Sequence, residues 1–465
     1  MAIDAIVLAA GDGKRLKSRL PKVLHVAAGR PLLGHVLASL APLELRRRVV
    51  VVSPRRDEIA RVLGEAGFSE GLELAVQEVP RGTGDAVRVG LEAAGLDEGT
   101  VLVTPGDTPL LTAETLRALL DAHAVSGAGA TVLTADMPDA TGYGRVVRGD
   151  GDEIARIVEH RDAAPEELEV NEINAGVYAF DTALLRDALA SIGSANDQGE
   201  EYLGDVLGPI AAAGKPVLAF KTHHEEVPGV NSRAQLAEAA AALRRRACLH
   251  WMREGVTIVD PATTYIDAGV TIAGDATIHP FTFLEGATSI AAGAEIGPQT
   301  RLVDTVVEDD ATVTFSVVRG SSIGPGASVG PFASLRPGTR LERGARAGTF
   351  VEVKSTTIGE GSKANHLAYL GDAEIGRGAN VGAGTITCNW DGRAKHKTVI
   401  EDEAYIGSDT MLVAPVRIGK RAATGAGSVV KGEVPDEALA VGVPARIIEG
   451  KGNRMEPKDP DPEPD

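Results

Sequence analysis

The chain has 465 residues, too many for one ordinary hydrophobic core, so we expect two or more domains. Its formal net charge of −18 disfavours unspecific binding to nucleic acid or to an anionic membrane, and leaves anionic small molecules as substrates that a local cluster of cations could bind. No apolar run is long enough to span a bilayer, the N-terminus is not a signal peptide, and Cys248 and Cys388 lack metal-ligand or redox spacing, so we expect a soluble cytoplasmic protein.

The first predicted element is a short apolar strand at residues 5–10, which runs directly into the glycine-rich segment 11–15. Glycines let backbone N–H groups approach an anion, so a strand that feeds such a loop is typical of phosphate binding. Arg15 and Lys22 would add fixed positive charge. The segment is not a Walker loop, because no Gly-Lys-Ser/Thr follows, and it lacks the third glycine of the dinucleotide fingerprint. A glycine turn without a ligand therefore stays open as an interpretation.

The next segments alternate between strand and helix patterns. Strands are predicted at 48–52, 73–77, 100–104 and 130–134, and helices at 55–66, 84–94 and 114–124. This alternation favours a doubly wound, mostly parallel sheet, in which ligands bind at the carboxyl ends of the strands. The loops expected there contain Gln77, Gly82, Thr83, Asp107, Gly144, Glu159, Asn174 and Asn231.

Asp107 stands out because it directly follows an apolar strand and lies between Gly106 and Thr108. A carboxylate at this place could hold Mg²⁺, which prefers oxygen ligands and substrate phosphates. It could equally be a turn aspartate that caps the helix starting near Thr112. The residues alone leave both interpretations open.

The alanine-rich segment 235–251 predicts one helix that joins two halves of the chain, and its run of three arginines, 244–246, is typical of a solvated helix face. We therefore expect a first domain at 1–232, a linker helix at 233–253 and a second domain at 254–450. Residues 451–465 are rich in Pro, Asp and Glu and predict a disordered acidic tail.

The second half carries apolar residues at every sixth position. Six is a multiple of the strand period but not a whole number of helical turns, so short strands can point all these residues the same way. Such hexapeptide repeats predict a parallel β-helix, with a β-sandwich of chance periodicity as the alternative. The spacing slips at 303–322, 364–374 and 388–399, which we interpret as loops that leave the solenoid and where function is expected. The ladders are Ile266, Ile272, Ile278, Leu284, Ile290, Ile296 and Leu302; Ile323, Val329, Leu335, Leu341, Ala347 and Val353; and Ile400, Ile406, Leu412, Ile418, Thr424 and Val430.

The order of motifs in the first half, LAAGDGKR, LPKVL, GTG and GDTPLL, resembles that of sugar-1-phosphate nucleotidyltransferases. The solenoid adds RPG at 336–338, FVEVK at 350–354, NHLAYLGD at 365–372 and GAGTITCN at 382–389. Together they resemble the family of bifunctional bacterial N-acetylglucosamine-1-phosphate uridyltransferases/glucosamine-1-phosphate acetyltransferases, over nearly the whole chain. The resemblance implies an α/β doubly wound nucleotidyltransferase domain followed by a left-handed parallel β-helix, and a homotrimer that shares its acetyl-CoA sites between subunits.

For the first domain the resemblance implies transfer of UMP from UTP to N-acetylglucosamine 1-phosphate. Arg15 and Lys22 would neutralise the triphosphate, and Asp107 and Asn231 would hold Mg²⁺. Gly144, Glu159 and Asn174 would bind the sugar phosphate. The nucleotide would contact Leu8, Ala9, Ala10, Gly11, Lys22, Gln77, Gly82 and Thr83.

For the solenoid the resemblance implies acetyl transfer from acetyl-CoA to glucosamine 1-phosphate. His366 would be the general base, because a histidine titrates near the working pH. Arg336 and Lys354 would clamp the phosphate, and Tyr369 and Asn380 would position the sugar. Acetyl-CoA would contact Ala383, Asn389, Trp390, Ser408, Ala426 and Arg446.

Three positions depart from the family pattern. Ala175 stands where the family often has Thr, Trp390 replaces a common Tyr, and the segment 440–446 resembles generic hexapeptide acyltransferases, with Arg446 as the candidate for the CoA phosphates. These departures motivate an alternative in which the chain is only a nucleotidyltransferase and the solenoid is a trimerisation scaffold or a relaxed acyltransferase. A regulatory subunit without activity is a further alternative, which the intact Arg15, Lys22, Asp107 and Asn231 disfavour.

Overall fold

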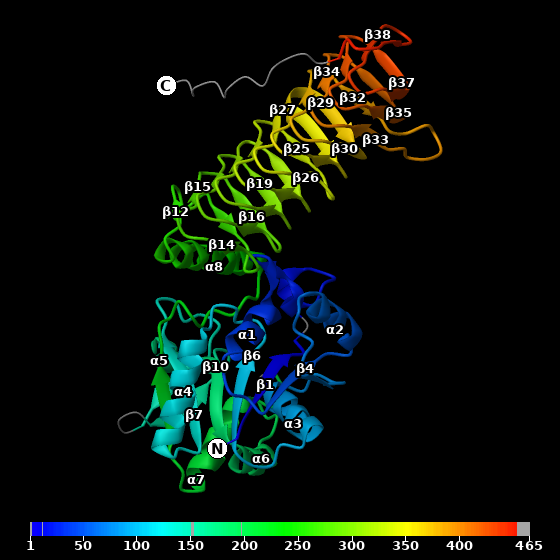
Figure 1. Cartoon of the computed structure of the whole chain (residues 1–465). Helices are drawn as coiled ribbons and strands as arrows, with labels where there is room; N and C mark the ends of the chain where they lie inside the picture. The colour runs from blue at the N-terminus through cyan, green and yellow to red at the C-terminus, as the bar shows by residue number, and fades with distance from the viewer. Residues whose placement is uncertain (1, 12, 150–152, 197, 453–465) are drawn as a thin grey trace. The chain divides into compact units, whose positions relative to one another are not determined.

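The computed structural model describes residues 2–11, 13–149, 153–196 and 198–452, and the chain divides into two compact units, Met1–Leu243 and Arg244–Asp465 (Figure 1). Of the predicted acidic tail, only Lys451 and Gly452 lie within the described residues. None of the described helices is long and apolar enough to cross a membrane.

The first unit is built on a twisted sheet whose strands run in the order β11–β7–β10–β6–β1–β4–β5, with β8 pairing β10 and β9. Most neighbours are parallel, but β10 runs antiparallel to β6 and β7. The strands are β1 (Ile3–Ala9), β4 (Arg47–Val52), β5 (Leu72–Val76), β6 (Thr100–Pro105), β7 (Ala130–Asp136), β8 (Arg145–Arg148), β9 (Ile154–Val158), β10 (Glu172–Asp181) and β11 (Val217–Lys221), with a small hairpin of β2 (Val26–Ala27) and β3 (Arg30–Pro31) outside the sheet.

Helices cover both faces of this sheet, as the doubly wound prediction requires. Ala5 and Val7 of β1 belong to one apolar cluster with α1, α2 and α4, whereas Ile6 belongs to another with α3, α6 and α7. Successive strand side chains point to opposite faces, so an uninterrupted apolar strand must be buried on both sides. The helices are α1 (Leu32–Leu40), α2 (Arg56–Glu65), α3 (Thr83–Ala94), α4 (Ala113–Ser126), α5 (Pro165–Leu168), α6 (Thr182–Leu189) and α7 (Leu207–Ala212), with 3₁₀ helices η1 (Lys14–Leu16), η2 (Lys22–Leu24) and η3 (Leu203–Val206).

Helix α8 (Arg233–Arg253) contains the boundary between the two units. Its N-terminal part contributes Leu236 and Ala239 to a cluster in the first unit, with Leu32. Its C-terminal part contributes Cys248 and Trp251 to the core of the second unit. The helix therefore matches the alanine-rich pattern, and each part has its own apolar partners.

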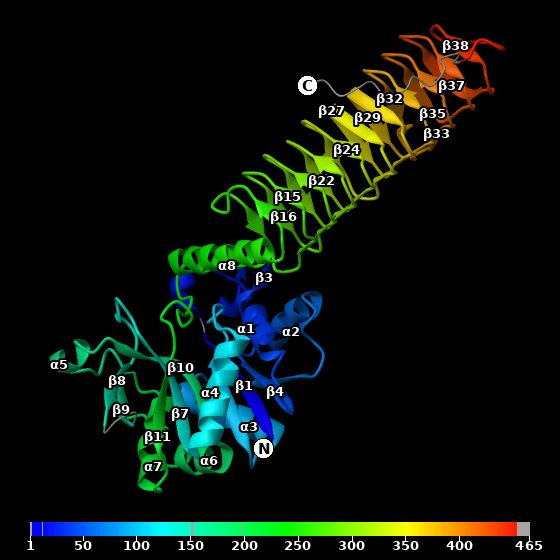
Figure 2. The same cartoon turned by 60° about the vertical axis from the view of Figure 1, so that its left-hand side comes forward.

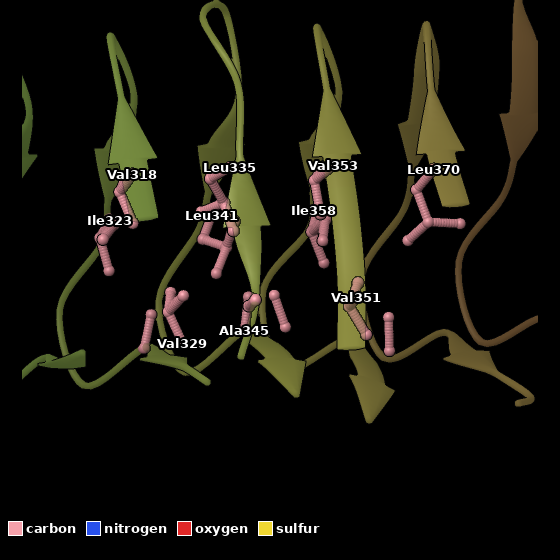
Figure 3. Close-up of a cluster of buried hydrophobic side chains, with 14 of the residues drawn as sticks. Val318, Ile323, Val329, Leu335, Leu341, Ala345, Val351, Val353, Ile358 and Leu370 are labelled. Atoms are coloured by element: carbon pink, nitrogen blue, oxygen red, sulfur yellow. The ribbon is translucent and has the colours of Figure 1, made fainter. Parts of the chain in front are cut away.

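The second unit is a parallel β-helix (Figure 2). Each strand pairs with a strand one coil later, so that Ile266 lies beside Leu284 and Leu284 beside Leu302. All residues of the three predicted ladders are buried, and Figure 3 shows how Val318, Leu335, Val353 and Leu370 repeat along the core. The hexapeptide prediction is confirmed, because each ladder residue packs on its equivalent in the next coil.

The strands of the β-helix are two or three residues long, except for β27, β29, β35 and β37 in its C-terminal half. They are β12 (Thr257–Ile258), β13 (Tyr265–Ile266), β14 (Thr271–Ile272), β15 (Thr277–Ile278), β16 (Phe283–Glu285), β17 (Ser289–Ile290), β18 (Glu295–Ile296), β19 (Arg301–Val303), β20 (Val306–Val307), β21 (Thr312–Val313), β22 (Val317–Arg319), β23 (Ser322–Ile323), β24 (Ser328–Val329), β25 (Ser334–Leu335), β26 (Arg340–Leu341), β27 (Arg346–Lys354), β28 (Thr357–Ile358), β29 (Lys363–Gly371), β30 (Ala373–Ile375), β31 (Asn380–Val381), β32 (Ile386–Cys388), β33 (Thr398–Ile400), β34 (Tyr405–Ile406), β35 (Met411–Ile418), β36 (Ala423–Thr424), β37 (Val429–Val434), β38 (Leu439–Val441) and β39 (Arg446–Ile448).

Of the three predicted excursions, all of which lie in the described part of the solenoid, only the last leaves the coils. Segments 303–322 and 364–374 remain in paired strands, because slightly shortened coils still bring Leu302 beside Val318 and Val353 beside Leu370. The prediction of loops there is wrong. The third excursion is confirmed: Ile375 pairs with Ile400, so this coil is longer than its neighbours, and the intervening loop extends from the coils beside β33 (Figure 1).

Candidate active sites

A cavity of about 800 Å³ opens in the first unit at the carboxyl ends of β1, β5 and β6. Its lining comes from segments that are far apart in the sequence, between Leu8 and Asn231. The structure brings together in this one cavity all the residues predicted for the nucleotide, the sugar phosphate and the metal: Leu8, Ala9, Ala10, Gly11, Arg15, Lys22, Gln77, Gly82, Thr83, Asp107, Gly144, Glu159, Asn174 and Asn231.

The glycine-rich turn is packed directly against the lysine segment. Gly13 has a φ of +60°, and a Cβ atom there would lie 2.6 Å from Cβ of Lys22, so only glycine fits without moving the chain. Arg15 lies on the exposed side of this turn and lines the cavity. The packing of the turn against Lys22 thus brings two cations, Arg15 and Lys22, into the lining of the cavity.

A cation centre lies beside this turn. The ammonium of Lys22 donates a hydrogen bond of 2.6 Å to Oδ1 of Asn231 and forms an ion pair with the carboxylate of Asp107. The two oxygen-bearing side chains also converge on Gly229, where a Cβ atom would be 3.7 Å from Oδ2 of Asp107 and 3.8 Å from Nδ2 of Asn231. An acidic and an amide oxygen that already share a cation form a donor set that fits Mg²⁺.

The capping alternative for Asp107 is wrong. Thr112 is itself the N-cap of α4, because its hydroxyl accepts a hydrogen bond of 3.2 Å from the backbone N–H of Thr115. The carboxylate of Asp107 turns instead to Lys22. No group of three or more His, Cys, Asp or Glu side chains suited to a metal occurs in the described part of the chain, so phosphates and water would have to complete the ion's shell.

The opposite wall of the cavity is formed where β5 leads into α3. Gln77 donates from Nε2 to Oδ2 of Asp85, at 2.8 Å, and to the carbonyl oxygen of Gly82, at 3.2 Å. Gly82 has a φ of +117°, and a Cβ atom there would lie 2.4 Å from the carbonyl oxygen of Glu201. The hydroxyl of Thr83 accepts from the backbone N–H of Leu203 at 2.9 Å. The segment around Glu201 is therefore fastened to the start of α3.

The third wall carries the residues predicted for the sugar. Nδ2 of Asn174 donates to the Tyr178 hydroxyl at 2.6 Å, and Oδ1 of Asn174 accepts from the backbone N–H of Gly176 at 2.9 Å. A Cβ atom at Gly144 would lie 3.1 Å from Oε1 of Glu159, so glycine leaves room for this carboxyl group. Burial, followed by the charges of nearby acidic side chains, raises the pKa of Glu159 above its usual value.

The solenoid has a cluster of cations on one face. Leu335 pairs with Val353, so the residues that follow them, Arg336 and Lys354, occupy equivalent positions in neighbouring coils. Nζ of Lys354 lies 3.4 Å from Oδ2 of Asp372. The Nδ2 of Asn389 donates to the same carboxylate.

Lys395 completes this cluster and was missed by sequence reasoning. It lies on the loop that leaves the coils, and close contact with Lys354, together with the charge of that ammonium, lowers the pKa of Lys395. Arg336 acts in the same direction. Arg336 is paired with Glu352 at 3.2 Å and Lys354 with Asp372 at 3.4 Å, so the three cations make a candidate anion site in which a ligand would compete with these carboxylates. The sequence signal was the excursion itself, which marked the loop but not which of its residues turns back to the coils.

His366 belongs to a column that runs along one corner of the solenoid. Ala364 pairs with Val381, and Val381 with Ile406, so His366, Ala383 and Ser408 are equivalent residues of successive coils. The backbone N–H of Asp409 donates to the carbonyl of Ala383 and that of Gly427 to the carbonyl of Ser408. Because Tyr405 pairs with Ala423, the next equivalent residue is Ala426. The structure thus aligns the predicted base with three of the residues predicted for acetyl-CoA.

The remaining residues predicted for the solenoid site are Tyr369, Asn380, Trp390 and Arg446. Tyr369 lies on β29 near the cation cluster, since a Cβ atom at Gly371 would be 2.5 Å from its hydroxyl and 2.8 Å from Nδ2 of Asn389. Asn380 pairs with Lys363, on the other side of the corner that carries His366, and so is not brought next to Tyr369 within one chain. Trp390 is exposed at the start of the loop. Arg446 pairs with Val441 at the last coil, close to the end of the His366 column.

A mostly parallel, doubly wound sheet with a cavity at the carboxyl ends of its strands is typical of nucleotide-binding enzymes. The family described as Nucleotidyl transferase matches residues 4–252, which includes every residue that lines the cavity. The first unit is a nucleotidyltransferase domain.

Relatives that match along almost the whole chain extend this assignment to the solenoid. A protein named Bifunctional protein GlmU from Thermobifida fusca is 51% identical over 98% of this chain and 95% of its own length. Proteins of the same name from Streptomyces coelicolor and Exiguobacterium sibiricum are 50% and 48% identical, over 97% and 94% of this chain and 94% and 96% of their own lengths. The chain belongs to the GlmU family of bifunctional enzymes, which join a uridylyltransferase to an acetyltransferase.

Proposed function

We propose that the chain acetylates glucosamine 1-phosphate with acetyl-CoA in the solenoid and then transfers UMP from UTP to N-acetylglucosamine 1-phosphate in the first unit. The observation that carries this proposal is the cavity in which residues between Leu8 and Asn231 converge around a paired cation and carboxylate. The volume of about 800 Å³ suits a nucleotide together with a sugar phosphate.

In the first unit a phosphate oxygen of the sugar attacks the α-phosphorus of UTP in line. The new P–O bond forms while the bond from the α-phosphorus to the bridging oxygen breaks, and pyrophosphate leaves. Two anions must approach each other, so catalysis needs positioning and neutralisation rather than a protein nucleophile. Arg15 and Lys22 supply fixed positive charge at the mouth of the cavity. Asp107 and Asn231 would hold Mg²⁺, which when bound neutralises phosphate charge.

In the solenoid the amine of glucosamine 1-phosphate must lose a proton before it attacks the thioester. The imidazole of His366 would take that proton, the amine nitrogen would bond to the carbonyl carbon, and the C–S bond would break to release CoA. Arg336, Lys354 and Lys395 would bind the sugar's phosphate, since they form one cationic cluster. A backbone N–H at Ala383 would stabilise the oxyanion of the tetrahedral intermediate.

The functional solenoid is proposed to be a homotrimer with its acetyl-CoA sites between subunits. Phe332, Phe350 and Leu367 occupy equivalent corner positions in successive coils, and each side chain is more than half exposed. The rings of Phe332 and Phe350 stack with centroids 5.6 Å apart. An exposed apolar column next to His366 supports a subunit interface there. The two cysteines are both free, which supports a cytoplasmic, reducing location.

The test is to measure both activities of the full chain after each site has been disabled separately. Asp107→Ala should abolish uridylyl transfer from UTP and leave acetylation near normal. His366→Ala should abolish CoA release and leave uridylyl transfer near normal. If either substitution removed both activities from folded protein, the model of two separate sites would fail. Retained acetylation in His366→Ala would exclude this residue as the base.

A further inference from the structure

The amide of Gln77 can face the cavity in only one orientation. Its Nε2 donates to the carboxylate of Asp85 and to the carbonyl of Gly82, at 2.8 and 3.2 Å. A carbonyl oxygen and an ionised carboxylate accept hydrogen bonds and cannot donate them. If the amide nitrogen and oxygen of Gln77 exchanged places, Oε1 would face two other acceptor oxygens without a hydrogen between them. Gln77 is only 5% exposed, which makes such an unpaired arrangement costly. The oxygen Oε1 is therefore the amide atom left for a ligand in the cavity.

Asp85 is itself held in place. It is 9% exposed and lies in the first turn of α3, where the helix dipole favours a negative side chain. Nη1 of Arg88 lies 3.1 Å from Oδ1 of Asp85, which leaves Oδ2 for Gln77. The other guanidinium nitrogen of Arg88 bonds to the carboxylate of Glu201 and to the carbonyl of Leu189. The carboxylate that orients Gln77 is thus fixed by an arginine that is anchored on two further segments.

We propose that Asp85 is a positioning residue that sets the nucleobase selectivity of the first unit by locking Gln77 as a hydrogen-bond acceptor. This inference rests on the proposed transfer of UMP. The pairing edge of uracil has one donor, N3–H, between two carbonyl oxygens, whereas cytosine has an unprotonated acceptor nitrogen at that place. An acceptor fixed at this place can bond to N3–H of uracil, but it faces the lone pair of the ring nitrogen of cytosine. A site that leaves a buried polar group unpaired with the wrong ligand discriminates strongly against it.

The isosteric substitution Asp85→Asn removes the shorter of the two contacts that orient Gln77, without changing the volume. An asparagine can present either its oxygen or its amino group to Gln77, so the flipped amide gains a hydrogen bond, and only the 3.2 Å contact with the Gly82 carbonyl still favours the native orientation. The reoriented amide can then donate to the ring nitrogen of cytosine. We expect the ratio of kcat/KM for UTP to that for CTP to fall by roughly tenfold or more, which is the effect of about one hydrogen bond. The fall should come from improved use of CTP as well as weaker use of UTP.

Asp97→Asn is the matched control. It also removes a carboxylate paired with an arginine, since Oδ1 of Asp97 lies 2.7 Å from Nη1 of Arg186, but Asp97 is exposed and does not line the cavity. This variant should keep the UTP-to-CTP ratio of the wild type. Thermal unfolding of both variants reports whether the first unit is folded, since acetyl transfer takes place in the other unit. A merely structural role of Asp85 would lower kcat/KM for the two nucleotides equally, and an unchanged ratio in Asp85→Asn would overturn the proposal.

A double variant tests whether Asp85 acts through Gln77. Once Gln77→Ala has removed the amide, adding Asp85→Asn should change the ratio no further; an independent second fall would overturn the assigned route. Should Asp85→Asn not fold, Asp85→Ala also removes the carboxylate that accepts from Gln77 and should lower the ratio in the same direction, and an unchanged ratio in that variant would equally overturn the proposal. Failure of the wild-type chain to use UTP would instead contradict the proposed function itself.

Discussion

The ammonium of Lys22 occupies the place that a divalent ion would need. It bonds to Oδ1 of Asn231 and pairs with Asp107, the two groups proposed to hold Mg²⁺. In the absence of nucleotide the lysine and a metal ion therefore compete for the same oxygens. We expect Lys22→Gln to bind Mn²⁺ more tightly than the wild type does, as measured by electron paramagnetic resonance without UTP. Uridylyl transfer by the same variant should fall steeply, because the triphosphate loses a cation. Weaker Mn²⁺ binding would contradict this competition.

The raised pKa of Glu159 has a defined consequence for stability. Burial and neighbouring acidic groups raise this pKa above its ordinary value of 4.5. Above pH 4.5 the carboxyl group therefore still holds its proton in the folded state when it has already lost it in the unfolded state. The resulting loss of stability is complete above the folded-state pKa and absent below the unfolded-state pKa. Glu159→Gln should therefore stabilise the first unit at pH 7 and have little effect near pH 3. Thermal unfolding of both proteins across that range measures the difference, and a stabilisation that does not depend on pH would contradict it.

Single residues were predictable where a motif places them in the sequence. Lys22, Asp107 and Asn231 could be found in this way, and the structure does bring them into one cavity. Asp85 could not, because its hydrogen bond to Gln77 depends on how the end of β5 meets the first turn of α3. Lys395 lies in a loop without periodicity, and only the folded loop shows that it turns back to Lys354.

At the scale of the elements, the loop between β32 and β33 provides an internal comparison of two lysines. Both lysines are exposed, but Lys395 lies against Lys354, whereas Lys397 is paired with Glu374. We expect Lys395→Ala to raise KM for glucosamine 1-phosphate about tenfold, since one charge-assisted contact to its phosphate is lost. Lys397→Ala should have little effect on KM, because an exposed ion pair contributes little. Steady-state kinetics of CoA release measure both, and equal effects would mean that the charge of the loop matters rather than this contact.

The repeats show what spacing can and cannot predict about elements. Apolar residues at every sixth position predicted the coils, because short strands at this spacing can point all of these side chains to one core, and three such ladders disfavour the β-sandwich alternative. The slips were ambiguous, since a shortened coil and an excursion both break the count. Leu302 still lies beside Val318, so the shortened corner keeps the core continuous. In the first unit the alternation of strand and helix patterns predicted the doubly wound sheet. Helix α1 was not assigned, and the prediction that Asn174 lies in a loop is wrong, because this residue belongs to the antiparallel strand β10.

At the scale of the whole molecule, the proposed trimer is needed for acetyl transfer but not for uridylyl transfer. The cavity for the nucleotide is lined by the first unit alone, whereas His366 lies next to the exposed column of Phe332, Phe350 and Leu367. A charge on this column should disrupt association without unfolding the chain, because the substituted side chains are exposed in the single subunit. We expect Phe332→Glu combined with Phe350→Glu to give a monomer that keeps uridylyl transfer and loses acetyl transfer.

Val306→Glu is the matched control for that experiment. Val306 is also apolar and exposed on the solenoid, but it lies in strand β20 and outside the corner column. Analytical ultracentrifugation should show a trimer for the wild type and for this control, and a monomer for the double variant. A double variant that stays trimeric would place the interface elsewhere on the solenoid. A monomer that still acetylates at the wild-type rate would mean that each chain holds a complete acetyl-CoA site. Asn380 of a second subunit would then not be needed next to Tyr369.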